Sequence, residues 1–505
     1  MGARHLTRTA LASCACLLVG ACGSSAPAQV STPTAGAAAI PAPAATATAR
    51  LLDWPEFGLD PGRGDTSERS TGITAANIGR LRRITVNVGG TVDSSPIYLH
   101  GALVAGGAHN VTVVTTTYGR TVAIDADNGR VLWSFTPPGY GAWAGSSQLT
   151  TTSPIADPGR LFVYAASPNG LIHKLSLANG GEVLSGSWPA RVTRDAGHEK
   201  LAAALNIDGP DVVVTTGGYY GDAPPYQGHV VLIDRASGRR RAVFNTLCAD
   251  RSELLQPSSC NSSDSAIWSR SGAVVEPGGT RIMISTGNGP WNGRTDFGDS
   301  VLELTFPGLR LVQSFTPSNQ AELNATDTDL GSSAPALLGS DRVSIAGKDG
   351  ILRVLVRSRL DGRSAAGGVG RRHRLGGEAQ RLGIPGGGQL LSAPAVWRRA
   401  GVTTMFLADE NGTAAYVLRG GRLLRAWENS KPGTSPLLVG GLLYVYEPSG
   451  GGIYVYRPGS PQPIAKLPGE AGHWNSPIVV DGHLIEPEGN ANDHRLSGRL
   501  ELFIP

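Results

Sequence analysis

The stretch Ser94-Ser95-Pro96-Ile97 decides the fold of this chain, because versions of it recur along the rest of the sequence. In each version a small residue and a proline precede an apolar strand, a turn, a second apolar strand and a further strand that ends in an Asp-containing turn. Six clear copies begin at 94, 152, 333, 392, 434 and 475, and two degenerate copies lie near 203–205 and 271–274. The chain therefore contains eight units of one repeat.

Units of about 40 to 60 residues with four short strands are typical of propeller blades. The stretches 111–115, 211–215 and 442–446 are apolar or β-branched and alternate as strands do. Each blade must bury its faces against its neighbours, so eight blades form one domain. We expect an all-β fold, a single eight-bladed β-propeller of four-stranded blades over residues 51–505.

The ring of blades must also close. We expect the segment 54–84 to supply a strand to the last blade, beside residues 500–503. A pair of β-sandwiches is the alternative architecture, but it does not explain eight copies of one opening. The abundance of glycine, at 69 residues, and of proline, at 34, agrees with many short strands joined by tight turns.

The N-terminus predicts export. Arg4 and Arg8 precede an apolar stretch, 9–21, that is shorter than the ~20 residues needed to span a bilayer but suits a signal peptide. The stretch ends in Leu-Val-Gly-Ala-Cys, which resembles a bacterial lipobox. We therefore expect residues 1–21 to be a lipoprotein signal peptide and Cys22 to be lipidated. A plain secretory signal with an incidental cysteine is the alternative.

Residues 22–50 are mostly Ala, Pro, Thr and Ser, with too little large apolar surface to fold. We expect a flexible tether between the lipidated Cys22 and the propeller. No later segment is apolar enough to suggest a transmembrane helix. The predicted location is the extracytoplasmic face of the cell membrane, with the lipid as the membrane anchor.

Two cysteines, Cys248 and Cys260, lie outside the leader and tether. In an oxidising compartment we expect them to form a disulfide, which would stabilise a loop of this length by about 3 kcal/mol in the chain-entropy model. Two buried thiols are the alternative. The sequence contains no C-x-x-C-H, so we expect no attached c-type haem.

Charge and motifs exclude several classes of function. A net charge of +4 over 505 residues argues against a dedicated nucleic-acid-binding protein. No G-x-S-x-G, H-E-x-x-H or G-x-x-x-x-G-K motif indicates a serine hydrolase, a zincin or a P-loop. Propellers also host glycosidases and lyases, and those activities stay open. We expect a monomer.

The stretch 123–133, Ala-Ile-Asp-Ala-Asp-Asn-Gly-Arg-Val-Leu-Trp, resembles the tryptophan-docking repeat of quinoprotein dehydrogenases, with Asn128 in place of a Thr. The resemblance implies a tight turn at Gly129 and a Trp133 that packs between adjacent blades. Weaker copies lie at 233–238 and in the strand that ends at Trp427. Noncatalytic relatives such as the outer-membrane assembly lipoprotein share this repeat, so it implies the fold and not catalysis.

A second set of residues is similar to the cofactor site of alcohol dehydrogenases that use pyrroloquinoline quinone (PQQ). The stretch 285–292, Ser-Thr-Gly-Asn-Gly-Pro-Trp-Asn, contains Asn288 at the position of a calcium ligand. The other matching positions are Trp268 as the floor under the quinone, Lys348 as a contact to its oxygens, and Asp329, with Asp327 as the alternative, as the catalytic carboxylate and a metal ligand.

The resemblance implies PQQ and calcium as cofactors. Calcium polarises a quinone carbonyl, a carboxylate takes the alcohol proton, and a cation stabilises the reduced quinone. The chain departs from the family in two ways. The usual calcium-binding Glu is replaced by Asp222 in an uncertain register, and the adjacent-cysteine disulfide that caps the cofactor is absent.

Two functions follow from these patterns. The first is the oxidation of a small alcohol, with electrons passed to a separate acceptor because no haem motif is present. The second is a noncatalytic propeller that binds proteins or other components of the cell envelope. The site residues in family order favour the first, and the two departures favour the second.

Overall fold

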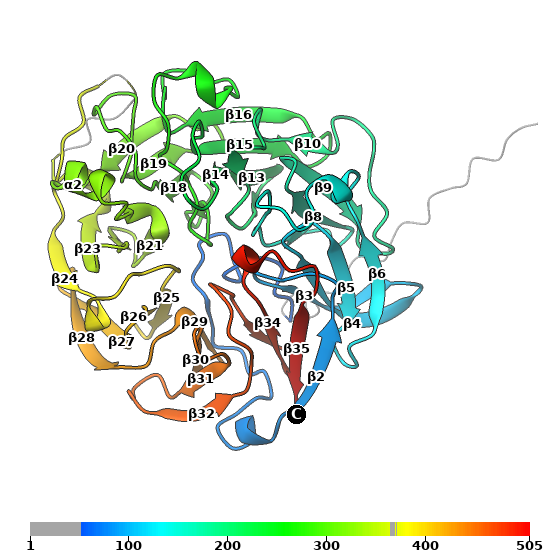
Figure 1. The fold of residues 1–505 in the computed structure, drawn as a ribbon. Helices are drawn as coiled ribbons and strands as arrows, with labels where there is room; N and C mark the ends of the chain where they lie inside the picture. Colours follow the sequence, from blue (N-terminus) through cyan, green and yellow to red (C-terminus); the bar gives the residue numbers. More distant parts are fainter. Residues whose placement is uncertain (1–51, 364–368, 370) are drawn as a thin grey trace, which may run out of the picture. The chain divides into compact units, whose positions relative to one another are not determined.

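The computed structural model describes residues 52–363, 369 and 371–505 (Figure 1). In this part of the chain seven four-stranded sheets and one five-stranded sheet are arranged as eight blades around a centre, and α2 (Gln320–Ala325) is the one α-helix. The predicted all-β, eight-bladed propeller is confirmed. The predicted signal peptide, the tether and Cys22 lie outside the described residues.

The blades are numbered I to VIII along the chain. Blade I consists of β3 (Ile97–Val104), β4 (Gly107–Thr115), β5 (Thr121–Asp125) and β6 (Val131–Phe135). Blade II consists of β7 (Ile155–Ala156), β8 (Phe162–Ser167), β9 (Leu171–Ser176) and β10 (Ala190–Arg191). Blade III consists of β12 (Asn206–Asp208), β13 (Asp211–Thr215), β15 (His229–Asp234) and β16 (Arg240–Asn245). Blade IV consists of β17 (Val274–Val275), β18 (Arg281–Ser285), β19 (Val301–Thr305) and β20 (Leu311–Phe315).

The second half of the ring repeats this order. Blade V consists of β21 (Ala336–Leu337), β22 (Arg342–Ile345), β23 (Ile351–Val356) and β24 (Gln380–Gly383). Blade VI consists of β25 (Ala395–Arg399), β26 (Val402–Ala408), β27 (Thr413–Arg419) and β28 (Arg422–Asn429). Blade VII consists of β29 (Thr434–Val439), β30 (Leu442–Tyr446), β31 (Ile453–Tyr456) and β32 (Pro463–Leu467), with β1 (Thr66–Ser67) added in parallel to β29. Blade VIII consists of β33 (Ile478–Val480), β34 (His483–Pro487), β35 (Arg499–Ile504) and β2 (Arg82–Asn87).

Short elements connect the blades. A two-stranded ribbon of β11 (Glu199–Lys200) and β14 (Gly217–Gly218) lies beside blade III. The 3₁₀ turns are η1 (Ile78–Arg80), η2 (Tyr140–Ala142), η3 (Pro257–Ser259), η4 (Leu330–Ser332), η5 (Arg357–Arg359), η6 (Pro385–Gly387) and η7 (Ala491–Asp493). Within the described residues, no helix is both long enough and apolar enough to cross a membrane.

The repeated openings lie at the first strand of each blade. In blade I, β3 begins at Ile97, directly after Pro96, and the same relation holds for the other clear copies except that β29 already begins at Thr434. The degenerate copies near 203–205 and 271–274 lie at the starts of β12 and β17. Proline fixes an extended approach to a strand, which explains why one local signal marks so many blades.

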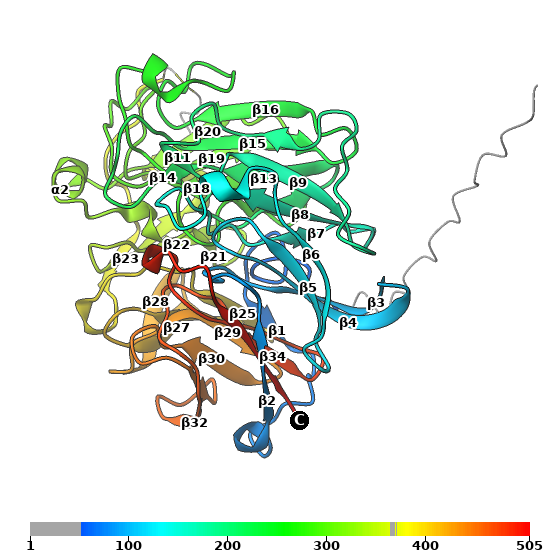
Figure 2. The same ribbon diagram turned by 45° about the vertical axis from the view of Figure 1, so that its right-hand side comes forward.

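The ring closes where the sequence predicts. β2 pairs with β35 in antiparallel fashion, with Ile84 opposite Leu502, and it lies in blade VIII (Figure 1, Figure 2). The strand extends to Asn87, three residues beyond the predicted end at Ile84. The last blade is therefore built from both ends of the folded chain.

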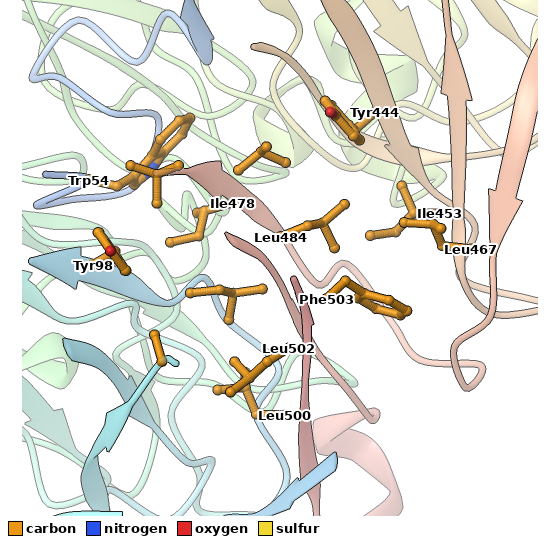
Figure 3. Close-up of a cluster of buried hydrophobic side chains, with 14 of the residues drawn as sticks. Trp54, Tyr98, Tyr444, Ile453, Leu467, Ile478, Leu484, Leu500, Leu502 and Phe503 are labelled. Atoms are coloured by element: carbon orange, nitrogen blue, oxygen red, sulfur yellow. The ribbon is translucent and has the colours of Figure 1, made fainter. Parts of the chain in front are cut away.

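The core lies between blades. Figure 3 shows Tyr98 of blade I, Tyr444 of blade VII, and Leu484 and Phe503 of blade VIII in one buried cluster with Trp54. Because neighbouring blades cover both faces of a sheet, all five residues of β13 are buried. The alternation that predicts such strands thus does not separate a buried face from an exposed one.

The docking tryptophans connect successive blades. Trp133 of blade I donates a hydrogen bond from Nε1 to the carbonyl oxygen of Leu177, 2.8 Å away, beyond β9 of blade II. A Cβ atom on Gly180 would lie 2.6 Å from the Trp133 ring, so this glycine allows the close approach. Trp427 of blade VI makes the same kind of bond to the Pro458 carbonyl, at 2.8 Å. The weaker copy at Trp427 therefore has the same role.

The N-terminal segment ties together blades that are not neighbours. The carbonyl oxygens of Pro55, Pro61 and Gly64 accept hydrogen bonds from backbone amides of blades II, IV and VI, at 2.8, 2.8 and 2.9 Å. These bonds pair the segment with the innermost strands, whose inner edges face the centre of the ring.

Candidate functional site

A central cavity of about 470 Å³ contains every residue that the sequence predicts for a cofactor site. These residues come from blades III to V and the loops that join them. The six are Asp222, Trp268, Asn288, Asp327, Asp329 and Lys348. The structure thus brings together positions that span more than a hundred residues of sequence.

Lys348 and the two candidate catalytic carboxylates form one ion-pair cluster. The Nζ atom of Lys348 lies 2.7 Å from Oδ2 of Asp329 and 3.1 Å from Oδ1 of Asp327. Asp329 is buried and Asp327 is exposed. Burial raises the pKa of Asp329 despite the opposing effect of Lys348, whereas the ion pairs raise the pKa of Lys348 despite its burial. Asp329 is therefore the carboxylate that is withdrawn from water.

Asn288 connects two of the acids. Its backbone N–H donates a hydrogen bond to Oδ1 of Asp329, and its side-chain Nδ2 donates to Oδ2 of Asp222 at 3.2 Å. The other Asp222 oxygen accepts a hydrogen bond of 2.6 Å from the Tyr226 hydroxyl. Gly287 makes this approach possible, because a Cβ atom there would lie 2.8 Å from Asp329 Oδ1.

Two indole rings lie side by side in the cavity. Lys348 Nζ lies 5.4 Å from the centre of the Trp268 ring, and the Trp268 and Trp474 rings are 5.5 Å apart at 37°. The Trp474 ring stacks on His473, with 3.8 Å between ring centres. The guanidinium of Arg270 lies 5.2 Å from the centre of the Trp474 ring. The cavity therefore offers aromatic surface flanked by cations, which suits a flat anionic ligand.

The second side of the cavity is formed by residues that the sequence motifs do not predict. Arg270 Nη2 and His473 Nδ1 each lie 2.7 Å from a carboxylate oxygen of the buried Asp93. Burial raises the pKa of Asp93, but Arg270 and His473 outweigh it and hold that pKa below its usual range. Asp93, Arg270 and Trp474 each stand directly before a repeat opening, and that position is the signal that would have found them.

Asp299 is a further buried acid beside this site. Leu330 N and Gln320 Nε2 donate hydrogen bonds to it at 3.2 and 3.3 Å. Burial and the nearby Asp329 raise the pKa of Asp299 to about 8. Asp299 therefore favours its neutral form and leaves the negative charge on Asp329.

The geometry of the cavity gives little support to the predicted calcium site. The described residues include no group of three His, Cys, Asp or Glu side chains arranged to hold a metal ion. Asn288 turns its amide nitrogen rather than its oxygen toward Asp222, and Lys348 neutralises Asp329. The residues as they stand do not fit a calcium ion, and the roles of Asp222, Asn288 and Asp329 as its ligands stay predictions.

Cys248 and Cys260 form a disulfide in the connection between β16 of blade III and β17 of blade IV. Gln227 Nε2 donates a hydrogen bond to Cys260 Sγ at 3.4 Å. Gln227 follows Tyr226, which lines the cavity. Neither cysteine lines the cavity, and Gln227 connects the disulfide to the residue next to the cavity wall.

Comparisons with known proteins agree with this fold. The family model described as outer membrane protein assembly factor BamB matches residues 74–288, which is less than half of the chain. No curated protein sequence matches the chain significantly.

Solved structures extend the similarity to the whole ring. A quinohemoprotein alcohol dehydrogenase from Comamonas testosteroni is 16% identical, with a TM-score of 0.62, over 91% of this chain and 81% of that one. The quinohemoprotein alcohol dehydrogenase ADHIIG from Pseudomonas putida HK5 is 13% identical, with a TM-score of 0.64, over 90% and 80%. A europium-containing methanol dehydrogenase is 14% identical, with a TM-score of 0.62, over 91% and 100%. The resemblance to PQQ-like β-propellers is confirmed, and at these identities the structural likeness concerns the fold.

Proposed function

We propose that this PQQ-like propeller binds PQQ in its central cavity and oxidises an alcohol there. One observation carries the proposal. The six residues that the motifs and their order predict line one cavity, where Lys348 is paired with Asp329 and lies 5.4 Å from the centre of the Trp268 ring. Inner loops of any propeller meet at the centre, but residues that only stabilised separate turns would not need the direct contacts that join Lys348, Asp329 and Asn288.

The chemistry of the cavity lining supports binding of the quinone. PQQ is a flat, acidic ortho-quinone, and the face of Trp268 would support its ring by stacking. The ammonium group of Lys348 would contact the quinone oxygens. When bound, the quinone would supply the acceptor for the hydride, and so for the two electrons, that leave the alcohol carbon.

The side chains of the protein would handle the proton. Asp329 is buried, and its raised pKa makes it a stronger base than an exposed carboxylate. It would take the hydroxyl proton of the alcohol, while Lys348 would stabilise the negative charge that develops on the quinone oxygen. The electrons would then pass to a separate acceptor, since the sequence has no haem-attachment motif.

Cofactor retention tests the proposal. Purified protein is mixed with PQQ, with and without calcium, freed of unbound cofactor and examined by absorption and by dye reduction with a panel of alcohols. We expect retained PQQ, weaker retention in Asn288→Ala, and loss of dye reduction in Asp329→Ala. Dependence of retention on calcium would support the predicted ion in the cavity. Wild-type protein that retains no PQQ at micromolar concentration would refute the proposal.

A second candidate is a noncatalytic propeller that binds proteins of the cell envelope. The observation that favours it is the match to the assembly-factor family over residues 74–288. That range includes Asp222, Trp268 and Asn288 but ends before Asp329 and Lys348. Failure of PQQ retention would leave this candidate as the better one.

We also propose that the protein acts outside the cytoplasm, held to the membrane by a lipid on Cys22. The signal-peptide pattern of residues 1–21 and the polar tether of residues 22–50 support this location.

A further inference from the structure

Lys200 is a cation of the cavity wall that lacks an acidic partner. Of the three Lys and Arg residues that line the cavity, Lys348 is paired with Asp329 and Arg270 with Asp93. The side-chain ammonium of Lys200 makes no hydrogen bond and no salt bridge with any residue in the described ranges. A partly buried charge without a partner is costly unless a ligand supplies one.

The strand that carries Lys200 fixes its direction. In β11, Glu199 and Lys200 are consecutive, so their side chains point to opposite faces. Glu199 is buried on the far side, where its Oε1 lies 2.9 Å from His229 Nε2 and accepts a hydrogen bond of 3.2 Å from the backbone N–H of Gln227. With Glu199 held in this network, Lys200 faces the cavity.

The ribbon also places Lys200 next to the aromatic floor. Lys200 pairs with Gly217 of β14, and a Cβ atom on Gly217 would lie 3.1 Å from Cβ of Trp268. Burial and the nearby Arg270 lower the pKa of Lys200 to about 7, and Asp93 opposes them. The charge of Asp93 is already shared by Arg270 and His473, so it does not neutralise Lys200.

We propose that Lys200 binds a carboxylate of the ligand in this cavity, so that the site recognises an aromatic acid and not merely a flat ring. This inference rests on the proposed function for the identity of the ligand, PQQ, and adds to it the residue that selects the acid. The acid group would lie on the side of Lys200 and Arg270, and the reacting oxygens on the side of Lys348.

Equilibrium binding, followed by quenching of tryptophan fluorescence without alcohol or dye, tests the assignment. The probes are PQQ and its trimethyl ester, which keeps the ring and the quinone but has no carboxylate. Lys200→Met should weaken PQQ binding by about ten-fold or more, as expected for a lost hydrogen bond to a charged group. The same variant should leave the Kd of the ester unchanged within about two-fold.

Two variants serve as controls. Lys431→Met removes one exposed positive charge outside the cavity and should not change either Kd. Lys200→Arg keeps the charge and should retain PQQ binding within a few-fold, which separates loss of the contact from misfolding.

The outcomes separate the two claims. If the wild type binds PQQ and Lys200→Met binds it equally well, the role of Lys200 is wrong while the proposed function stands. An equal loss of both probes in Lys200→Met would also overturn the role, because it would indicate a damaged cavity rather than a lost carboxylate contact. If the wild type binds neither probe, the proposed function fails and the assignment fails with it.

Discussion

Nζ of Lys348 lies 2.7 Å from Oδ2 of Asp329, and this ion pair joins the turn after β22 to the approach to β21 at the centre of the ring. Two neighbouring loops of blade V thus present a base and a cation to one cavity. Asp327 also contacts Lys348, at 3.1 Å, but from an exposed position. The difference in burial is what distinguishes the two carboxylates.

Replacement of Asp329 by Asn should reduce the rate of dye reduction by about 10²- to 10⁴-fold, the usual contribution of a general base. Binding of PQQ should persist, because the amide keeps the size of the side chain. Asp327→Asn is the matched control and should cost less than about ten-fold, since water already solvates that carboxylate. Steady-state rates of both variants decide which carboxylate is the general base, and a larger loss of rate in Asp327→Asn would assign that role to Asp327.

Trp133→Ala should destabilise the propeller by about 3–5 kcal/mol, the range for removal of a buried large aromatic residue. The ring packs against Gly180, and its Nε1 bonds to Leu177 in the next blade. Urea denaturation measures the change in the free energy of unfolding. Val131→Ala, at an exposed position of the same strand, should change it by less than about 1 kcal/mol, and a similar loss in both variants would argue against a docking role.

The blade count and the meeting of six candidate residues in one cavity could be predicted because their signals are local. A proline before each first strand marks the blades, and the motifs around Trp268, Asn288, Asp329 and Lys348 each lie within a short stretch. Only the order of these motifs was needed to place them in one cavity, since successive blades turn their inner loops toward the same centre.

The contacts on the second side of the cavity could not be predicted in this way, although Asp93, Arg270 and Trp474 are marked by their positions before repeat openings. His473 and Asp93 are neighbours because the ring closes, and their contact joins the loop before blade VIII to the loop before blade I. No short motif encodes that closure. Lys200 likewise lacks an acidic partner because the nearby acids pair with other cations, and the sequence does not show which residues pair.

Replacement of Cys22 by Ser should release the protein into the soluble extracytoplasmic fraction or leave an uncleaved precursor. The thiol is the acceptor of the lipid in the predicted lipobox, and serine cannot replace it. Fractionation followed by mass spectrometry of the N-terminus measures both results. A Cys14→Ser variant controls for loss of a cysteine within the leader, and a cleaved, membrane-bound Cys22→Ser protein would contradict the prediction.

Glu486→Gln should stabilise the protein at pH 8. The Glu486 side chain is fully buried, both of its oxygens lack hydrogen-bond partners in the described structure, and Glu501 lies directly opposite it on β35. Burial and the nearby Glu488 and Glu501 raise the pKa of Glu486, and burial with Glu501 raises the pKa of Glu488 to about 7. Like charges at opposite positions of a sheet are destabilising, so the neutral amide should gain at least about 1 kcal/mol.

The sign of the pH dependence follows from these raised pKa values. A carboxyl group whose pKa is higher in the folded state binds its proton more tightly there, so its contribution to stability is complete below about pH 4.5 and is lost as the pH rises through its folded pKa. The gain of Glu486→Gln over the wild type should therefore be small near pH 4.5 and grow toward pH 8. Urea midpoints across this range measure the gain, with the exposed Glu322→Gln as control. A gain that shrinks as the pH rises would show that Glu486 is charged and stabilised in the native blade.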